Sequence, residues 1–199
     1  MHRQPEGGGE ALNEERARWD AKYSGRTPGP CDGVSPFVAE ALERLGAGAG
    51  PALDLAMGAG RHALAAARAG WRVVGLDLSG VAAQQVAAEA RAKDLPVQAV
   101  VADALTFPVK SAAFGLVICT RFLERELAGR IAGALAPGGH LIFETFTVEQ
   151  PSLGWGPKNP AFLLSPNELL HLFPGLHVLE YRERVDAKLG ATASLLARR

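Results

Sequence analysis

The sequence has 199 residues, of which 48% are hydrophobic, so the chain can bury a full core and we expect a single domain. Its 21 basic residues equal its 21 acidic residues, which argues against nucleic acid or an anionic membrane as a partner. No apolar run nears the roughly 20 residues of a membrane span, and the first residues lack the apolar segment of a secretory signal. Two cysteines, Cys31 and Cys119, give neither a disulfide framework nor a metal-ligand spacing. We therefore expect a cytoplasmic protein without a metal site.

Two helices are predicted before the first strand. Residues 1–10 are rich in glycine, and we expect them to be disordered. A polar helix is expected over 11–23, followed by a loop over 24–33 that contains three glycines and two prolines. Ser35 and Pro36 are typical of an N-cap and a first helical residue, and the apolar residues after them recur at helical spacing.

From residue 52 onward, predicted strands and helices alternate. Strands are expected at 52–56, 72–76, 97–101, 113–119 and 140–146, and helices at 61–69, 79–93 and 124–136. This alternation is typical of a parallel sheet with helices on both faces.

The C-terminal part of the sequence breaks the alternation. Residues 147–165 form a long connection without clear periodicity. Ser165-Pro166-Asn167-Glu168 then has the pattern of a capping box, with Ser165 as the N-cap and Glu168 at the third helical position. Two strands are expected at 176–185 and 191–197, so we predict an antiparallel hairpin at one edge of the sheet.

The loop after the first predicted strand carries the clearest chemical signal. Asp54 ends this strand, and Gly58 and Gly60 follow before the next helix. Glycine lets a ligand approach the main chain, and the amides at the start of the helix point into the same crevice. Gly58, Gly60 and Ala63 also fit the dinucleotide fingerprint, with Asp77 19 positions after Gly58, so a nicotinamide-dependent reductase is an alternative.

Asp54 favours a cationic ligand over a dinucleotide. An acid four residues before the first glycine would repel a pyrophosphate, whereas it would attract a positively charged amino-acid or sulfonium group. Together with Asp77, it therefore favours S-adenosylmethionine (SAM) as the cofactor.

The stretch Asp54-Leu55-Ala56-Met57-Gly58-Ala59-Gly60 resembles motif I of the class I SAM-dependent methyltransferases. Its continuation from Arg61 to Ser79, and the segment from Asn159 to Leu164, are similar to the tellurite-resistance-type subgroup. Leu135-Ala136-Pro137-Gly138-Gly139-His140-Leu141 is similar to another class I segment, whereas Met57 departs from the small residue or cysteine of the family.

This resemblance implies an α/β fold, a Rossmann-like three-layer sandwich. Its seven-stranded, mostly parallel sheet would end in the C-terminal antiparallel hairpin. One methyltransferase domain would occupy 1–199, with 1–34 as a lid segment that is partly disordered and 35–199 as the core.

Three of the predicted strands end in an acid, namely Asp54, Asp77 and Asp103. Because the carboxyl ends of parallel strands meet at one edge, these acids should line one crevice. The resemblance implies that Asp77 binds the ribose hydroxyls and that Asp103 or Ala104 reads the adenine, although a loop-capping role would also explain Asp103. The predicted cofactor-binding residues are Asp54, Ala56, Gly58, Gly60, Arg61, Asp77, Leu78, Ser79, Asp103, Ala104 and Cys119.

The acceptor side is predicted at the ends of the next two strands. Arg121 and Glu144 are the candidate catalytic residues, Glu144 either as a base or to orient the acceptor. The zero net charge and the aromatic residues in this region favour a small-molecule acceptor. The predicted substrate-binding residues are Tyr23, Arg121, Phe122, Phe146, Trp155 and Asn159.

Two segments could enclose this site. Trp19-Asp20-Ala21-Lys22-Tyr23 resembles a family segment that folds over the cofactor, and a plain surface helix is the alternative. Residues 147–165 are expected to form one wall of the acceptor pocket or to be a passive crossover.

The expected reaction is in-line displacement of the SAM methyl group, which yields S-adenosylhomocysteine without a covalent enzyme intermediate. A non-catalytic SAM-binding module is a third hypothesis, since methyl transfer requires no unmistakable catalytic residue. We expect a monomer or a homodimer.

Overall fold

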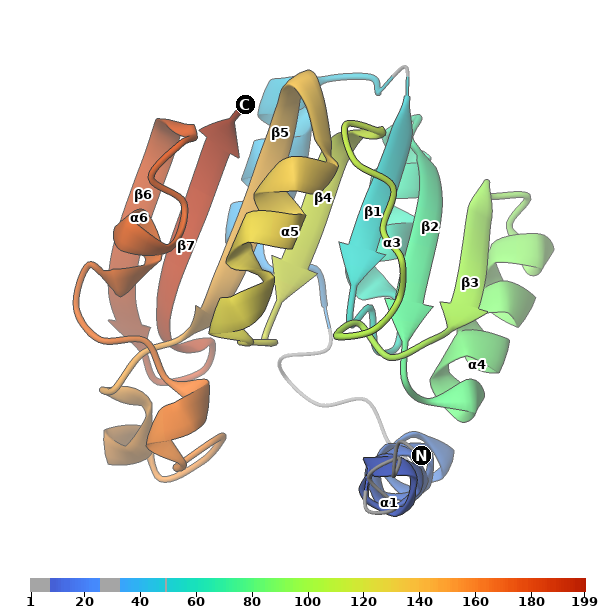
Figure 1. Ribbon diagram of the computed structural model, residues 1–199, viewed down its shortest axis with the longest axis horizontal. Coiled ribbons are helices and arrows are strands. Elements are labelled where there is room, and N and C mark those ends of the chain that lie inside the picture. Colours follow the sequence, from blue (N-terminus) through green and yellow to red (C-terminus); the bar gives the residue numbers. More distant parts are fainter. Residues whose placement is uncertain (1–7, 26–32, 49) are drawn as a thin grey trace, which may run out of the picture.

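The computed structural model describes residues 8–25, 33–48 and 50–199. Within these residues, seven strands form one sheet in the order β3-β2-β1-β4-β5-β7-β6 (Figure 1). β1 to β5 are parallel, whereas β7 runs antiparallel to both β5 and β6. The predicted sheet, mostly parallel with an antiparallel C-terminal hairpin, is therefore confirmed. The expectations for residues 1–7, and for the loop segment 26–32 that contains Cys31, lie outside the described residues.

The elements follow one another in nearly the predicted order. The strands are β1 (Pro51–Leu55), β2 (Arg72–Asp77), β3 (Val97–Val101), β4 (Phe114–Thr120), β5 (Leu135–Phe146), β6 (His177–Asp186) and β7 (Gly190–Arg198). The α-helices are α1 (Gly8–Ser24), α2 (Pro36–Leu45), α3 (Arg61–Arg68), α4 (Gly80–Ala92), α5 (Ala128–Ala134) and α6 (Glu168–Leu172), and the 3-10 helices are η1 (Arg125–Leu127), η2 (Gln150–Leu153) and η3 (Pro160–Phe162).

Helices cover both faces of the sheet, which gives three layers. On one face, Ile118, Ile142 and Leu196 pack with apolar residues of α2 and α3. On the other face, Cys119, Phe143 and Leu195 pack with apolar residues of α5 and α6 (Figure 1). Because side chains alternate along a strand, each central strand contributes to both clusters. This explains why β4 is apolar almost throughout.

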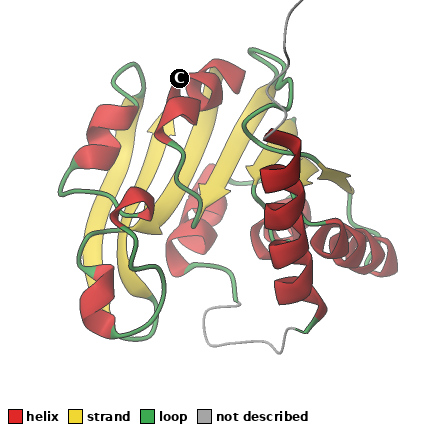
Figure 2. Cartoon of the chain, turned by 60° about the horizontal axis from the view of Figure 1, so that its bottom comes forward, coloured by secondary structure: helices red, strands yellow, loops and turns green. Residues whose placement is uncertain are grey.

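Helix α1 lies beyond the carboxyl ends of the strands. Figure 2 shows it crossing in front of the sheet at this edge. It contacts the rest of the chain mainly through α4. The helix has few apolar residues, and Tyr23 is its buried anchor. The predicted polar helix at 11–23 is thus present, and it covers the edge that carries the predicted cofactor loop.

Strand β5 begins five residues earlier than the sequence predicted. Leu135 already pairs with Phe114, and the register shifts before His140 pairs with Leu116. Gly138 has a φ of 76°, and its amide donates to the carbonyl of Arg199 (3.1 Å). The Arg199 amide donates in turn to Gly139 (2.9 Å). Pairing with Arg199, far along the chain, therefore makes residues 135–139 an irregular part of the strand.

The predicted capping box at α6 is only half formed. Asn167, with a φ of 60°, is the N-cap, so Ser165 is not, and Glu168 is the first helical residue. The Glu168 Oε2 atom nevertheless accepts from the Ser165 amide (2.8 Å), as the glutamate of a capping box would. The other carboxylate contacts of Glu168 go to Arg125, which ties α6 to η1.

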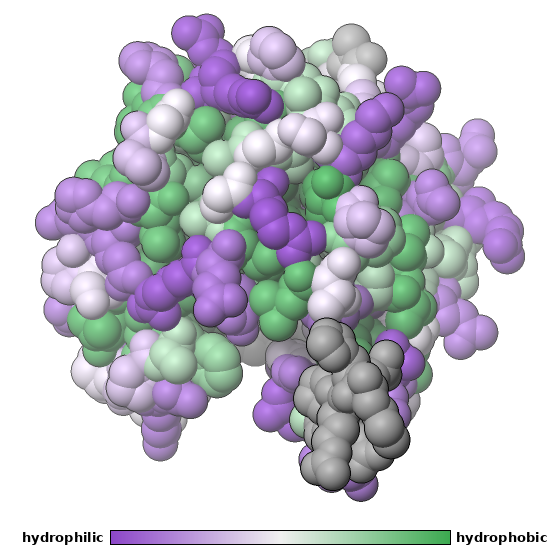
Figure 3. Space-filling model, in the orientation of Figure 1, coloured by the Kyte–Doolittle hydropathy of each residue, from purple (hydrophilic) through white to green (hydrophobic). Residues whose placement is uncertain are grey.

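Exposed apolar side chains are spread over the surface. The large ones are Val101, Leu105, Val148, Phe162, Val178 and Val185, and they come from several different elements. Figure 3 shows hydrophilic side chains around the rim of one face, with hydrophobic ones in patches between them. The exposed apolar residues do not share one element, as is normal for a globular domain.

The first prediction concerns Met57, the residue that departs from the family pattern. A Cβ at Gly75 of β2 would overlap the Met57 Sδ atom. Gly75→Ala should therefore destabilise the fold by about 1–3 kcal/mol through overpacking, measured by denaturant unfolding. Gly80→Ala is the matched control, because nothing lies within 4 Å of its added Cβ. Adding Met57→Ala to Gly75→Ala should recover part of the loss, and additive effects would contradict this explanation.

Candidate active site

Asp77 joins the two loops that border the cofactor edge. Its Oδ2 atom accepts from the Gly58 amide and its Oδ1 atom from the Ser79 amide, both at 2.8 Å. Gly58 lies in the loop after β1, and Ser79 is the N-cap of α4 after β2. Burial raises the pKa of Asp77, and the two donated hydrogen bonds oppose that rise. The carboxylate thus fixes the main chain on both sides of the crevice.

Asp54 lies beneath the loop rather than on its surface. Its side chain is 1% exposed, and its Oδ2 atom has no hydrogen-bond partner among the described residues. Desolvation raises the pKa of Asp54 to about 7, although the Ala63 amide lowers it. The carboxyl is therefore only partly ionised at neutral pH, which weakens the electrostatic argument made for it from the sequence.

The loop after β1 has a left-handed backbone at three positions. Ala56, Gly58 and Gly60 have φ values of 53°, 56° and 73°. A Cβ at Gly58 would lie 2.6 Å from the Tyr23 hydroxyl, and one at Gly60 would lie 2.5 Å from Val86 Cγ2. Both glycines are therefore required by close approach as well as by backbone conformation.

Helix α1 is bound to the start of α4 by polar contacts. Asp20 Oδ1 accepts from the Ser79 hydroxyl (2.5 Å) and from the Val81 amide (3.1 Å), and these bonds lower the pKa of Asp20. Gln85 Nε2 donates to the Tyr23 carbonyl (3.3 Å). Tyr23, predicted as a substrate residue, thus lies over the cofactor loop.

The remaining predicted cofactor residues lie at or near the same edge. Asp103 follows β3, and its Oδ1 atom accepts from the Leu105 amide (2.9 Å), which is the loop-capping role considered as an alternative. Ala104 is buried beside it, and Leu78 lies between Asp77 and Ser79. Cys119 is 1% exposed, and burial raises its pKa far above the usual range, so its thiol is unreactive.

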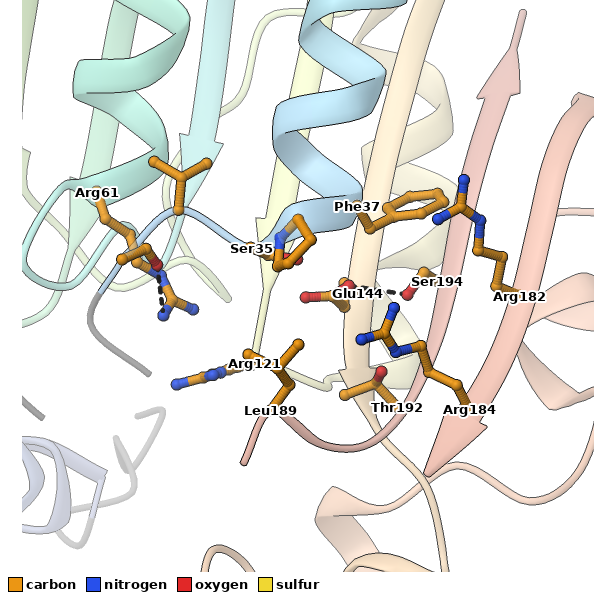
Figure 4. A pocket seen from close by; sticks show the side chains of 13 residues that line it. Ser35, Phe37, Arg61, Arg121, Glu144, Arg182, Arg184, Leu189, Thr192 and Ser194 are labelled. Carbon is orange, nitrogen blue, oxygen red and sulfur yellow. Dashed lines mark hydrogen bonds between the residues drawn. The ribbon is translucent and has the colours of Figure 1, made fainter. Parts of the chain in front are cut away.

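A cavity of about 110 Å³ opens beyond the ends of β4 and β5, against the start of α2. Arg121 and Glu144 line it, as do Arg61 and two further arginines from β6, Arg182 and Arg184 (Figure 4). Of the residues predicted for the acceptor side, the structure brings Arg121 and Glu144 together here. Arg61, predicted for the cofactor, also borders this cavity.

Glu144 is held by the neighbouring strand β7. The Ser194 hydroxyl donates to Glu144 Oε2 (2.8 Å), and the Glu144 carboxylate is buried at 8% exposure. Arg121 has a φ of 54°, a strained conformation for a residue with a side chain. Its amide donates to the Glu144 carbonyl (2.8 Å), and its guanidinium lies over the Phe146 ring at 5.5 Å. Such strain at a strand end is typical of functional positions.

His62 connects the two parts of the site. The Ser35 amide donates to His62 Nε2 (3.2 Å), so Nδ1 carries the proton and donates to Thr120 Oγ1 (2.9 Å). Burial holds the pKa of His62 well below its usual value, and the ring is neutral. His62 thereby fixes the start of α2 and the end of β4 around the cavity.

Besides Tyr23, four predicted substrate residues lie elsewhere than in this cavity. Phe146 and Trp155 pack edge to face at 6.1 Å, and Trp155 Nε1 donates to the Ala187 carbonyl (3.1 Å). Asn159 caps η3 through the Ala161 amide, and Phe122 packs against the core. In this structure they brace the walls of the site instead of lining the cavity.

Strands β6 and β7 supply cavity residues that were not predicted from the sequence. Arg182, Arg184, Thr192 and Ser194 all line the cavity. Thr192 and Ser194 alternate with alanines in a strand that is buried almost throughout. Two polar residues at alternate positions of an otherwise apolar strand share one face of the sheet, and this pattern in the sequence could have identified them as site residues.

Known proteins resemble this chain in sequence and in structure. Residues 52–139 match the family described as a methyltransferase domain. A protein solved in work on the conversion of a disulfide bond into a thioacetal group during echinomycin biosynthesis is 25% identical, with 92% of this chain and 91% of that chain covered and a TM-score of 0.70. The matched part of the chain, a little under half of its length, is thus similar to a methyltransferase domain.

Two further solved structures resemble the methyltransferase domain in fold. TehB from Haemophilus influenzae is 20% identical, with 93% of this chain and 67% of that chain covered and a TM-score of 0.68. The [4+2]-cyclase SpnF is 19% identical, with coverage of 82% and 79% and a TM-score of 0.68. A search of curated proteins gave no match. Among the described residues, no helix is both long and apolar enough to span a membrane.

The second prediction concerns the buried carboxyl of Asp54. Its pKa of about 7 in the folded protein lies above the usual value of 3.8, so the folded protein holds a proton that the unfolded chain releases. The stability that this group contributes is therefore present below pH 4 and is lost as the pH rises from about 4 to about 7. In the variant Asp54→Asn this dependence should disappear.

Denaturant unfolding of both proteins at several pH values measures this effect. The free energy of unfolding of the wild type, relative to Asp54→Asn, should fall by up to about 1.4 kcal/mol per pH unit in that window. Asp94→Asn, at an exposed position after α4, is the control for general charge effects. A difference between wild type and Asp54→Asn that stays constant with pH would contradict the raised pKa.

Proposed function

We propose that this methyltransferase domain moves the methyl group of SAM to a small-molecule acceptor held in the cavity beside Glu144. The observation that carries the proposal is the continuity of the two parts of the site. Arg61 directly follows the glycine loop and also lines the cavity. His62, next to it, bonds to Ser35 and Thr120 on the cavity side. A cofactor over the loop and an acceptor in the cavity would therefore be neighbours.

The residues around the loop fit SAM. Each Asp77 oxygen accepts one amide, and a carboxylate offers about four lone-pair positions, so Asp77 can still accept from two ribose hydroxyls. Gly58 and Gly60 keep the main chain open to a close ligand, and Arg61 is suited to the carboxylate of the amino-acid end. Asp103 and Ala104 remain the residues proposed for the adenine.

When bound, SAM supplies an electrophilic methyl group, whose carbon–sulfur bond breaks as the acceptor's lone pair bonds to the carbon. The chain's contribution is to orient the acceptor and to remove its proton. Glu144 is buried and held by Ser194, so its orientation is fixed before the acceptor binds. A carboxylate in this position can accept the proton of an acceptor hydroxyl, thiol or amine. Positioning of this kind supplies roughly 7–11 kcal/mol in well-oriented reactions.

The size and walls of the cavity support a small acceptor. Its volume of about 110 Å³ is below the range of whole drug-sized pockets, roughly 300–1,000 Å³. The cavity lies between the sheet and the start of α2, where a nucleic-acid strand would not fit. Helix α1, bound to Ser79 and Val81 through Asp20, supports the proposal that residues 1–34 cover the cofactor.

The third prediction tests the cofactor. Titration calorimetry should detect binding of SAM and S-adenosylhomocysteine, and no binding of NAD. Asp77→Ala should weaken SAM binding by about 1–3 kcal/mol, roughly 5- to 150-fold, because hydrogen bonds to a charged group are lost. Glu89→Ala, on the exposed face of α4, is the control. Unchanged affinity in Asp77→Ala would remove the ribose assignment, and a wild type that binds NAD but not SAM would overturn the proposed function.

The fourth prediction tests Glu144 as the base. Glu144→Gln keeps an oxygen that can accept from Ser194, so the fold and SAM affinity should be unchanged. The rate of transfer of a tritiated methyl group to a panel of thiols, oxyanions, halides and small amines should fall roughly 10²- to 10⁴-fold for acceptors that lose a proton. Glu149→Gln, at an exposed position, should react as the wild type does. An equal rate in Glu144→Gln would show that no base is needed there.

A further inference from the structure

A row of polar side chains crosses the sheet at the edge of the cavity. Thr120 of β4 pairs with Glu144 of β5, Glu144 with Ser194 of β7, and Ser194 with Arg182 of β6. Two residues earlier along the chain in β4 and β5, and two residues later in β7, the same face carries Ile118, Ile142 and Leu196, which pack under α2 and α3. The face thus changes from apolar to polar where α2 begins.

Three of the four residues in this row are buried, so the row requires an explanation. Thr120 and Glu144 are both 8% exposed and Ser194 is 1% exposed. The hydrogen bonds from His62 to Thr120 and from Ser194 to Glu144 offset part of the cost of burying these groups, whereas an apolar row like the one beside it would pack without that cost. A row that continues into a cavity is better explained by a polar ligand than by packing.

Arg182 and Arg184 of β6 lie at the far end of the row, away from the cofactor loop. Arg184 of β6 pairs with Thr192 of β7 in the next row on the same face, and Figure 4 shows its side chain reaching toward Glu144 and Ser194. Its recorded ion pair, with Asp186, is long at 3.8 Å and exposed to solvent. Arg182 has a structural role, because it pairs with Glu40 (2.6 Å) and Glu180 and lies over the Phe37 ring at 5.3 Å.

The charge of the cavity wall favours an anion. Its lining includes four arginines and one carboxylate, Glu144. Arg182 is balanced by Glu40 and Glu180, and Arg61 lies on the side of the cofactor loop. Arg184 lies on the β6 side of Glu144, and Arg121 lies on the side of β4. The first residues of α2, Ser35 to Phe37, also line the cavity, and the positive end of a helix dipole favours negative charge in the same place.

We infer that the acceptor carries an anionic group, a carboxylate or a similar oxyanion, separate from the atom that is methylated. Arg184 binds this group at the β6 side of the cavity, and the nucleophilic atom lies on the side of Glu144 and the cofactor loop. Guanidinium groups match carboxylates and other oxyanions in geometry as well as charge. The inference rests on the proposed function in one respect, because it takes the bound anion to be the methyl acceptor.

The sheet order limits the length of such an acceptor. β6 is two strands from β5, or about 10 Å at the usual strand spacing of roughly 4.8 Å. The Arg184 side chain reaches back over part of that distance (Figure 4). Only a few atoms therefore separate the anionic group from the nucleophile, in keeping with the small cavity.

Binding of matched thiols to the protein saturated with S-adenosylhomocysteine tests the inference, because no transfer takes place in that state. The probes are 3-mercaptopropionate, 2-mercaptoethanesulfonate, the neutral 2-mercaptoethanol and the cationic cysteamine. Calorimetry measures the affinity of each. The two anions should bind at least roughly 10-fold more tightly than the other two, and the ratio between them distinguishes a carboxylate from a sulfonate site. Arg184→Gln should remove roughly 10- to 100-fold of the anion affinity and leave that of 2-mercaptoethanol unchanged.

Two further variants separate a binding role from a structural one. Arg184→Lys should restore part of the anion affinity, since it keeps the charge but loses the two-pronged geometry. Arg72 is exposed at the start of β2, at the opposite ends of the strands from the site. Arg72→Gln removes the same charge, and this variant should bind all probes as the wild type does. An anion preference that is absent from the wild type, or that survives in Arg184→Gln, would overturn the inference.

The same titrations distinguish this failure from failure of the proposed function. If S-adenosylhomocysteine binds and the anions show no preference, the acceptor class is wrong and the methyltransferase proposal stands. If the anions bind through Arg184 but neither SAM nor S-adenosylhomocysteine binds, the anion site stands and the proposed function fails.

Discussion

The two hydrogen bonds from the Gly58 and Ser79 amides to Asp77 are the interaction on which the cofactor side depends. They hold the loop after β1 at a fixed distance from the residue that caps α4. No regular secondary structure connects the two at this point. Ser79 then caps α4 and donates to Asp20, so the position of α1 depends on the same contact. A single carboxylate thus fixes the crevice and the helix that covers it.

On the acceptor side, the constraint is the pairing of four strands rather than one side chain. Glu144 keeps its orientation because Ser194 is opposite it in β7, and Ser194 is placed by its pairing with Arg182 in β6. His62 joins this side to the cofactor loop through neutral hydrogen bonds, which do not change with pH near neutrality. The two halves of the site are therefore built differently but share one helix, α3.

The sequence was sufficient for the sheet and the hairpin, because these depend on local patterns. Apolar runs marked each strand, and the acids after three of them marked the common edge. The start of β5 was not predictable in the same way, since Gly138 and Gly139 join the strand through hydrogen bonds with Arg199, far along the chain. The cap of α6 likewise depends on the left-handed backbone at Asn167, whose amide donates to Glu183 of β6 (2.7 Å).

The acceptor residues were predicted least well, for a physical reason. Arg121 and Glu144 follow strands whose ends could be located from the sequence, and both line the cavity. Whether Arg182 and Arg184 face the cavity depends on the register of β6 against β7, which a one-residue slip would reverse. Trp155 and Asn159 were chosen because they lie in a long loop, yet their contacts brace that loop.

The position of β7 between β5 and β6 has a consequence for how the protein is made. β6 leaves the ribosome before β7, but it has no partner in the sheet until β7 has emerged and inserted beside β5. Strands β1 to β4 can pair earlier, during synthesis, whereas the side of the sheet around Glu144 is completed last. A nascent chain would thus expose the unpaired edge of β5 for a time, and such an edge can pair with other chains.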